Sequence, residues 1–345
     1  MAGMKALLLR KHIVPLIAAV VIATLAGCLA TAPPPAPGQT ATGFTFGVIG
    51  DLGYSPQEEP LLANVLADLN RDTSLAFVVH VGDLSSPRFG CTEELWARRF
   101  AQFRALVHPL VYTPGDNEWT DCHAPDVPGG DPLERLAKLR TVFFEGNHTL
   151  GRRTFALTRQ SGSGGAFAKY RENVRWELGE VTFLTLHVTG SNNGRGRSSD
   201  GDAEYAERNQ ANLAWLRQGF DDAKARNSRA IMILQQANLF HEFPPFPGTP
   251  QNPSGFSDLR IQLQLAGDAF RKPIVLVHGD SHFFRIDRPL SPRVTQNAPP
   301  VEHFTRVETF GSPYHHWVHV TVDPGDPNVF TFRQRLVTAN LAPPR

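Results

Sequence analysis

The stretch FTFGVIGDLG, residues 44–53, opens the part of the chain that predicts a fold. Its first six residues have the composition of a β-strand, and a Gly-Asp pair follows directly. The same order recurs in LAFVVHVGDLS at 75–85 and in HPLVYTPGDNE at 108–118, and PIVLVHGDSH at 273–282 repeats it. Aspartates at the ends of several strands predict carboxylates that converge on one edge of a sheet.

Helical patterns separate the first three strands. Residues 58–69, 92–106 and 131–144 place apolar residues at helical spacing, and Thr92 and Asp131 are suited to cap two of these helices. The order β-α-β-α-β-α predicts a layered α/β sheet. Farther along, the sequence predicts an antiparallel hairpin (174–178 and 181–188), helices (203–226 and 257–270) and strands (229–235, 317–322 and 328–333).

A metal site is the leading hypothesis for the predicted sheet edge. Buried carboxylates repel one another, so they need a cation or a proton. Oxygen ligands with one imidazole suit Mn, Fe, Mg or Ca better than a metal that prefers thiolates, and the set is large enough for one or two ions. The predicted ligands are the polar residues that follow the strands: Asp51, Asp83, Asp116, Gln236, Asp280 and His282.

The ordered motifs over residues 43–285 resemble those of the calcineurin-like metallophosphoesterases. That family's pattern runs Asp-x-His, Gly-Asp, Gly-Asn-His-Asp/Glu, a strand-end His and Gly-His-x-His. The GDLG string at 50–53 is also similar to the first motif of the purple acid phosphatases, and NQANLAWL at 209–216 is similar to a Q-x-x-W-L helix common in the family. The resemblance implies a layered α/β/β/α sandwich of mixed sheets, and hydrolysis of a phosphate mono- or diester by metal-activated hydroxide.

The resemblance also implies roles for the predicted ligands. Asp51 matches the first metal ligand and Asp83 the ligand that bridges two ions. Asp116 stands in place of the family's Asn, and Gln236 in place of its strand-end His. Asp280 and His282 occupy the two positions of Gly-His-x-His.

Three positions depart from the family pattern. Gly53 replaces the His of Asp-x-His, Ser86 stands where purple acid phosphatases have a Tyr, and Asn117 occupies the position of the usual catalytic His. We assign Asn117 and Glu118 as candidate catalytic residues, while Glu118 equally suits a residue that orients a ligand. The departures leave two other interpretations open: a non-catalytic envelope binding protein that retains the fold, and a calcium-stabilised structural lipoprotein.

The N-terminus has the pattern of an export signal. Lys5, Arg10 and Lys11 precede an apolar stretch at 13–26 that is too short for a comfortable membrane span. LAGC at 25–28 matches a bacterial lipobox, although a plain secretory signal with a chance Cys is the alternative. We therefore expect a signal peptide at 1–27, lipidated Cys28 with a Pro/Ala-rich linker at 28–42, and one metallophosphoesterase domain at 43–345 in a protein anchored in the bacterial cell envelope.

The charge composition limits the kinds of molecule that we expect the protein to bind. The whole chain carries a net charge of +1, and removing residues 1–27 leaves 31 basic against 33 acidic residues, a charge near −2. Because the sequence has no basic tract, we do not expect the protein to bind nucleic acid. We expect a small phosphorylated substrate, and the sequence leaves the oligomeric state open. Outside the cytoplasm, Cys91 and Cys122 are expected to form a disulfide, with two free thiols as the alternative.

Other polar residues have two interpretations each. His80 and His278 suit hydrogen-bonded core positions better than metal ligands. His187 could face the site or serve the structure, and Arg195 and Arg197 could contact a phosphate or remain solvated.

Overall fold

The structure is a computed structural model that describes residues 42–124, 127–240, 254–291 and 301–341. Thr40–Arg345 form one compact unit. The predicted signal peptide and the predicted lipid on Cys28 lie outside the described residues. In the part of the chain that is described, no helix is long and apolar enough to cross a membrane.

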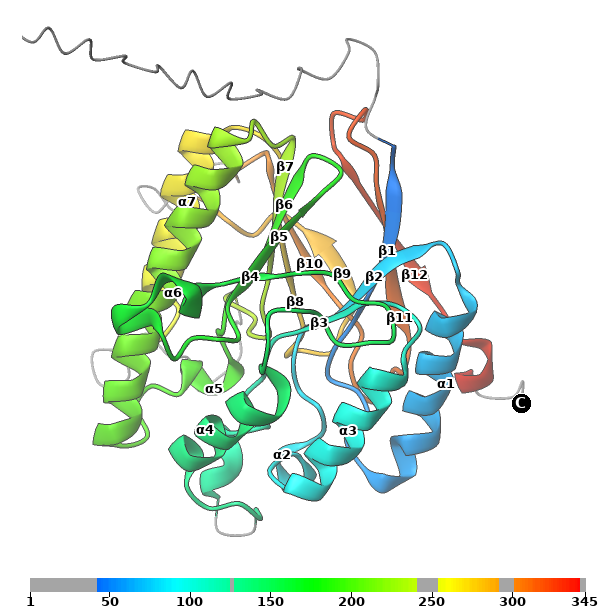
Figure 1. Ribbon diagram of the computed structural model, residues 1–345, viewed down its shortest axis with the longest axis vertical. Helices are drawn as coiled ribbons and strands as arrows, with labels where there is room; N and C mark the ends of the chain where they lie inside the picture. The colour runs from blue at the N-terminus through cyan, green and yellow to red at the C-terminus, as the bar shows by residue number, and fades with distance from the viewer. Residues whose placement is uncertain (1–41, 125–126, 241–253, 292–300, 342–345) are drawn as a thin grey trace, which may run out of the picture. The chain divides into compact units, whose positions relative to one another are not determined.

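Two mixed β-sheets form the middle of this unit (Figure 1). The first sheet has the strand order β12-β11-β1-β2-β3, with β1, β2 and β3 parallel. The second has the order β4-β5-β6-β7-β8-β10-β9, with β6, β7, β8 and β10 parallel. The strands are β1 (Phe44–Ile49), β2 (Leu75–His80), β3 (Leu110–Tyr112), β4 (Thr158–Arg159), β5 (Val174–Leu178), β6 (Val181–Thr185), β7 (Ala230–Leu234), β8 (Ile274–His278), β9 (Arg285–Asp287), β10 (Phe304–Glu308), β11 (Trp317–Val322) and β12 (Phe330–Arg335).

Helices cover the outer face of each sheet (Figure 1). The first sheet packs against α1 (Glu59–Arg71), α3 (Glu93–Ala105) and α4 (Pro132–Phe143), and the second against α6 (Ser199–Ala225) and α7 (Ser257–Phe270). Two short helices, α2 (Pro87–Gly90) and α5 (Gly190–Asn193), lie in loops. The layers are therefore the predicted α/β/β/α sandwich.

The two sheets are joined by an aromatic core. Phe46 and Phe77 of the first sheet stack with their ring centroids 4.5 Å apart, and Phe183 of the second sheet meets both rings edge-on. All three side chains are fully buried. Burial of one such ring stabilises the fold by roughly 1.5–3 kcal/mol, which holds the sheets in register and aligns their strand ends.

Most of the predicted helices and strands are confirmed, and so are the two predicted helix caps. The side chains of Thr92 and Asp131 accept hydrogen bonds from the Leu95 and Leu133 amides. Helix α6 begins earlier than predicted, because Ser198 caps it by accepting from the Gly201 amide.

Strand β10 was missed at the sequence level, together with the short strands β4 and β9. Arg306 and Glu308 interrupt the apolar pattern of β10, although both are buried. Arg306 pairs with Asp287, and Glu308 pairs with Arg285 at 2.6 Å. Cross-strand neutralisation of this kind cannot be seen in a local pattern.

Candidate functional site

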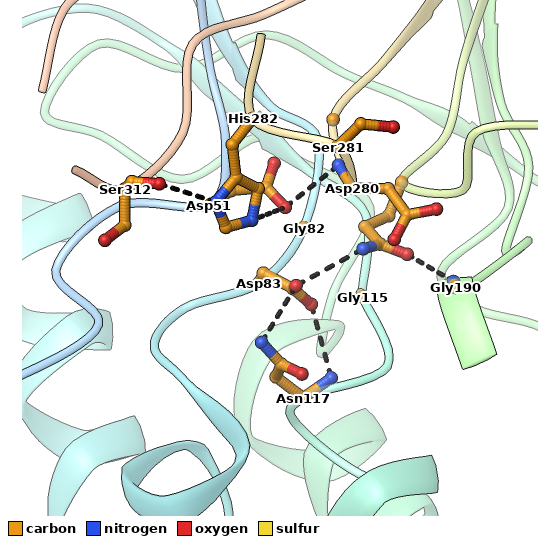
Figure 2. Close-up of polar contacts among 12 residues, drawn as sticks. Asp51, Gly82, Asp83, Gly115, Asn117, Gly190, Asp280, Ser281, His282 and Ser312 are labelled. Atoms are coloured by element: carbon orange, nitrogen blue, oxygen red, sulfur yellow. Dashed lines mark hydrogen bonds and ion pairs between the residues drawn. The ribbon is translucent and has the colours of Figure 1, made fainter. Parts of the chain in front are cut away.

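The six predicted ligands come together where strands of both sheets end. Figure 2 labels four of them, Asp51, Asp83, Asp280 and His282. The Asp280 amide donates to Asp51 Oδ1 at 3.0 Å, and His282 Nε2 lies 3.5 Å from the same oxygen. Gln236 Nε2 donates to Asp83 Oδ2 at 3.2 Å. Strand ends more than 200 residues apart in the sequence thus meet at one place, as the Gly-Asp strings predicted.

The glycines of these strings make room for carboxylates from neighbouring strands. A Cβ at Gly115 would collide with Oδ1 of Asp83, and a Cβ at Gly279 would collide with Oδ2 of Asp51. Only glycine lets the backbone approach a neighbouring carboxylate this closely.

Strained backbone conformations cluster at the site. Seven of the eleven described non-glycine residues with positive φ lie in it or in the adjoining turn at 191–193. Among them, φ is 56° at Asp51 and Asp83, 77° at Asp280 and 70° at His282. Such conformations are costly for residues with a side chain and persist where the surroundings enforce them, which is typical of functional sites.

In the described parts of the chain, the buried carboxylates of the site lack lysine and arginine partners. Asp51, Asp83 and Asp116 are buried, and none of them pairs with a lysine or arginine in the described parts of the chain. Burial and the charges of Asp116 and Asp51 raise the pKa of Asp83 well above its usual range. Burial, with Asp121 and Asp280, does the same to the pKa of Asp116. Burial also raises the pKa of Asp280 to about 7. The basic side chains of the protein therefore do not neutralise the negative charge of these carboxylates.

His282 is held in a fixed orientation. Its Nδ1 lies 2.7 Å from the Ser312 carbonyl oxygen, which turns Nε2 toward Asp51. Although burial disfavours its charged form, the Asp51 carboxylate raises the pKa of His282 to about 9. A carbonyl that holds one ring nitrogen while the other faces carboxylates is the usual arrangement of a metal-binding histidine.

Tyr54 is a site residue that sequence reasoning missed. Its hydroxyl donates to Asp83 Oδ2 at 2.6 Å and lies 3.2 Å from His282 Nε2 and 3.4 Å from Asp51 Oδ1. The resemblance directed attention to Ser86, whereas the tyrosine comes from the loop after β1. Its place three residues after Asp51 was the available signal.

The hydrogen bonds of Gln236, Asn117 and Glu118 show which role each side chain plays in the site. Gln236 Oε1 accepts from the Gly190 amide at 2.5 Å, so its amide nitrogen faces Asp83. Asn117 Nδ2 also donates to Asp83 Oδ2, at 2.9 Å. Glu118 is fully buried and accepts from the Leu84 amide and the Tyr112 hydroxyl. As placed, Asn117 orients Asp83, and Glu118 joins the loops after β2 and β3.

A turn after β6 closes one side of the site. Ser191, Asn192 and Asn193 have consecutive left-handed conformations. The Ser191 hydroxyl reaches Asp116 Oδ2 at 2.8 Å and Asp121 Oδ2 at 3.1 Å, and Arg197 pairs with Asp121. Ser191 and Asp121 are further neighbours of the site that the sequence did not single out.

The remaining candidates lie outside the carboxylate group. His80 and His278 are buried in the core, and burial lowers the pKa of each to about 3. His187 is buried and contacts Glu172, with its Nδ1 2.9 Å from Oε1. The expected disulfide is present between Cys91 and Cys122, and it joins the loops that follow Asp83 and Asp116.

The donors fit a hard cation chemically, although they do not surround a single point. Among the described residues, no three His, Cys, Asp or Glu side chains are arranged to hold a metal ion. Yet Asp51 Oδ2 and Asp116 Oδ1 are buried without a hydrogen-bond partner. Unpartnered buried carboxylate oxygens are what a hard cation would satisfy.

Comparison with known proteins identifies the fold. No family model matches the sequence, and no curated protein matches it significantly. A solved structure of PhoD superposes with a TM-score of 0.54 and 16% identity, over 84% of this chain and 66% of that one. This chain thus spans just under two thirds of that PhoD chain. GAP50, the anchor in the inner membrane complex of Plasmodium, gives a TM-score of 0.45 and 10% identity over 85% of this chain and 89% of that one, too low to support a conclusion. The likeness to PhoD, at this identity, shows the fold alone: this protein folds like PhoD.

Proposed function

We propose that the protein is a metal-dependent phosphoesterase that hydrolyses a phosphate mono- or diester. The observation that carries the proposal is the group of buried aspartates at the strand ends, which among the described residues have His282 but no lysine or arginine as a partner. The fold and the order of the motifs support a phosphate ester as the substrate, because phosphoryl oxygens and carboxylates share a preference for hard cations.

Asp51, Asp83, Asp116, Asp280 and His282 are the residues that would hold one or two ions such as Mn, Fe, Mg or Ca. Bound cations of this kind supply hydroxide at neutral pH and neutralise a phosphoryl oxygen. The chain's own contribution is positioning. Two amides, from Asn117 and Gln236, hold Asp83, and the Ser312 carbonyl orients His282.

A non-catalytic binding protein is the second candidate, and Tyr54 favours it. Its hydroxyl already occupies the space between Asp51, Asp83 and His282. If the hydroxyl excludes metal, Tyr54→Phe will bind Mn more tightly than the wild type. Equal or weaker binding by the variant would favour the enzyme.

Export and lipid anchoring on Cys28 also remain proposals. The Cys91–Cys122 disulfide supports them, because such bonds persist mainly outside the cytoplasm. Mass spectrometry of the membrane-derived protein should find a lipid on Cys28 at a new N-terminus; an intact residue 1–27 segment would contradict the proposal.

The first experiment is elemental analysis of the purified protein, alongside hydrolysis of a phosphomonoester and a phosphodiester with Mn added. We expect one or two metal ions per chain and turnover. Asp83→Asn should lose both, whereas the exposed Asp221→Asn on α6 should keep both. Full activity in Asp83→Asn would falsify the proposal.

A further inference from the structure

The rim of the site carries two exposed aromatic rings. Phe283 is 61% exposed and Tyr314 is 50% exposed, and across the described residues they are the only aromatic side chains among the exposed large hydrophobic ones. Their ring centroids lie 6.5 Å apart. Single exposed apolar residues are ordinary, whereas these two exposed rings lie near each other and beside the site.

Both rings stand next to the accessible part of the site. Phe283 directly follows His282, whose side chain is 23% exposed, in contrast to the fully buried Asp51. Tyr314 lies two residues after Ser312, the residue whose carbonyl contacts His282. Both rings therefore lie on segments that contain or contact His282, a site residue whose side chain is accessible to solvent.

The backbones that carry the rings are held in place. The Tyr314 amide donates to the Gly311 carbonyl at 2.7 Å, and the Ser312 amide donates to the Asp51 carbonyl at 2.8 Å. The neighbouring Phe284 stacks on the buried Phe310 with centroids 5.2 Å apart. A ligand that stacks on the rings therefore does not have to order the backbone that carries them.

We propose that Phe283 and Tyr314 bind the organic group of the phosphate ester, and that this group contains an aromatic ring. The inference rests on the proposed function, since the buried site would hold the phosphoryl group while the aromatic pair holds the remainder of the molecule. Aromatic rings attract one another in edge-to-face or offset-stacked arrangements with centroids 4.5–7 Å apart, so an exposed ring offers a face to an aromatic ligand. Among the described residues, the other side of the site presents the polar side chains of Ser191, Asp121 and Arg197.

Binding of two phosphonates tests the inference without requiring turnover. Calorimetry of the purified protein with Mn should show phenylphosphonate binding about tenfold more tightly than methylphosphonate. The double variant Phe283→Ser/Tyr314→Ser should lose this preference and keep its affinity for methylphosphonate, which also shows that the variant is folded. Phe283→Leu should lose part of the preference, and Leu265→Ser, a change at a comparably exposed residue on α7, should lose none.

Hydrolysis then separates this inference from the proposed function. Turnover of phenyl phosphate and methyl phosphate with equal KM values, or equal affinities for the two phosphonates, would overturn the aromatic site. No binding of either phosphonate would overturn it as well. A preference for phenylphosphonate that depends on the pair, without turnover of any ester, would support the aromatic site and reject the enzyme.

Discussion

Two groups of buried charges in this protein are arranged in opposite ways. In the network around Glu172, each acid has a basic partner: Arg140 and His187 contact Glu172 at 2.6 and 2.9 Å, and Arg208 contacts Glu204 at 2.8 Å. In the candidate site, the buried aspartates have only His282. Burial alone would raise the pKa of Glu172, but Arg140 and His187 lower it well below its usual range.

The difference shows which charges serve the fold. A buried acid is tolerated when its partners are built into the chain, as around Glu172. The aspartates of the site lack such partners, although the chain supplied them elsewhere at equal depth. We infer that their partner comes from outside the chain.

The largest expected effect is on the network around Glu172. Glu172→Ala leaves Arg140 buried without its partner, so we expect the free energy of unfolding to fall by about 3–5 kcal/mol. Urea denaturation at neutral pH measures this. As a control, Glu207→Ala removes an exposed partner of Lys169 and should change stability by less than about 1 kcal/mol. An equal loss of unfolding free energy in Glu172→Ala and Glu207→Ala would contradict the idea that the buried ion pair stabilises the fold more than the exposed one.

Metal ions should stabilise the folded protein by binding to the aspartates of the candidate site. Mn at about one hundred times its dissociation constant should raise the unfolding free energy by about 2.7 kcal/mol, because the ion binds only the folded chain. Thermal denaturation with and without Mn is the measurement. Asp83→Asn should abolish most of the increase, and an unchanged wild-type midpoint would mean that no cation completes the site.

Without metal, removing one acid from the site should stabilise the protein. Asp116→Asn relieves repulsion from Asp121 and Asp280, so we expect a gain of about 1–2 kcal/mol in EDTA. This sign is opposite to that of Glu172→Ala. A loss of stability in Asp116→Asn would show that the site is neutralised internally.

Acid should weaken the network around Glu172. Because the folded pKa of Glu172 lies below its ordinary value of 4.5, its stabilisation is present above that pH and lost as the pH falls below it. Below pH 4.5, the wild type should lose up to about 1.4 kcal/mol per pH unit more than Glu172→Gln. Denaturant titrations between pH 3 and about 6 compare the slopes, and parallel curves would contradict the assignment.

Local patterns predicted most of the fold. The strand-like runs that end in Gly-Asp, and the helices capped by Thr92 and Asp131, are where the sequence placed them, because these signals lie within a few neighbouring residues. Strand β10 was missed because its buried charges, Arg306 and Glu308, are neutralised by Asp287 and Arg285 of the neighbouring strand β9.

The sequence by itself determined which carboxylates gather at the sheet edge, since a strand's end and the aspartate after it are adjacent in the chain. Only the tertiary structure decided what surrounds them. Tyr54 meets His282 across 228 residues, and Gln236 meets Asp83 across 153, with its amide nitrogen rather than its oxygen toward the carboxylate. The same packing pairs the rings of Phe283 and Tyr314. Distances between such remote segments are set by how the two sheets pack, and no local pattern encodes them.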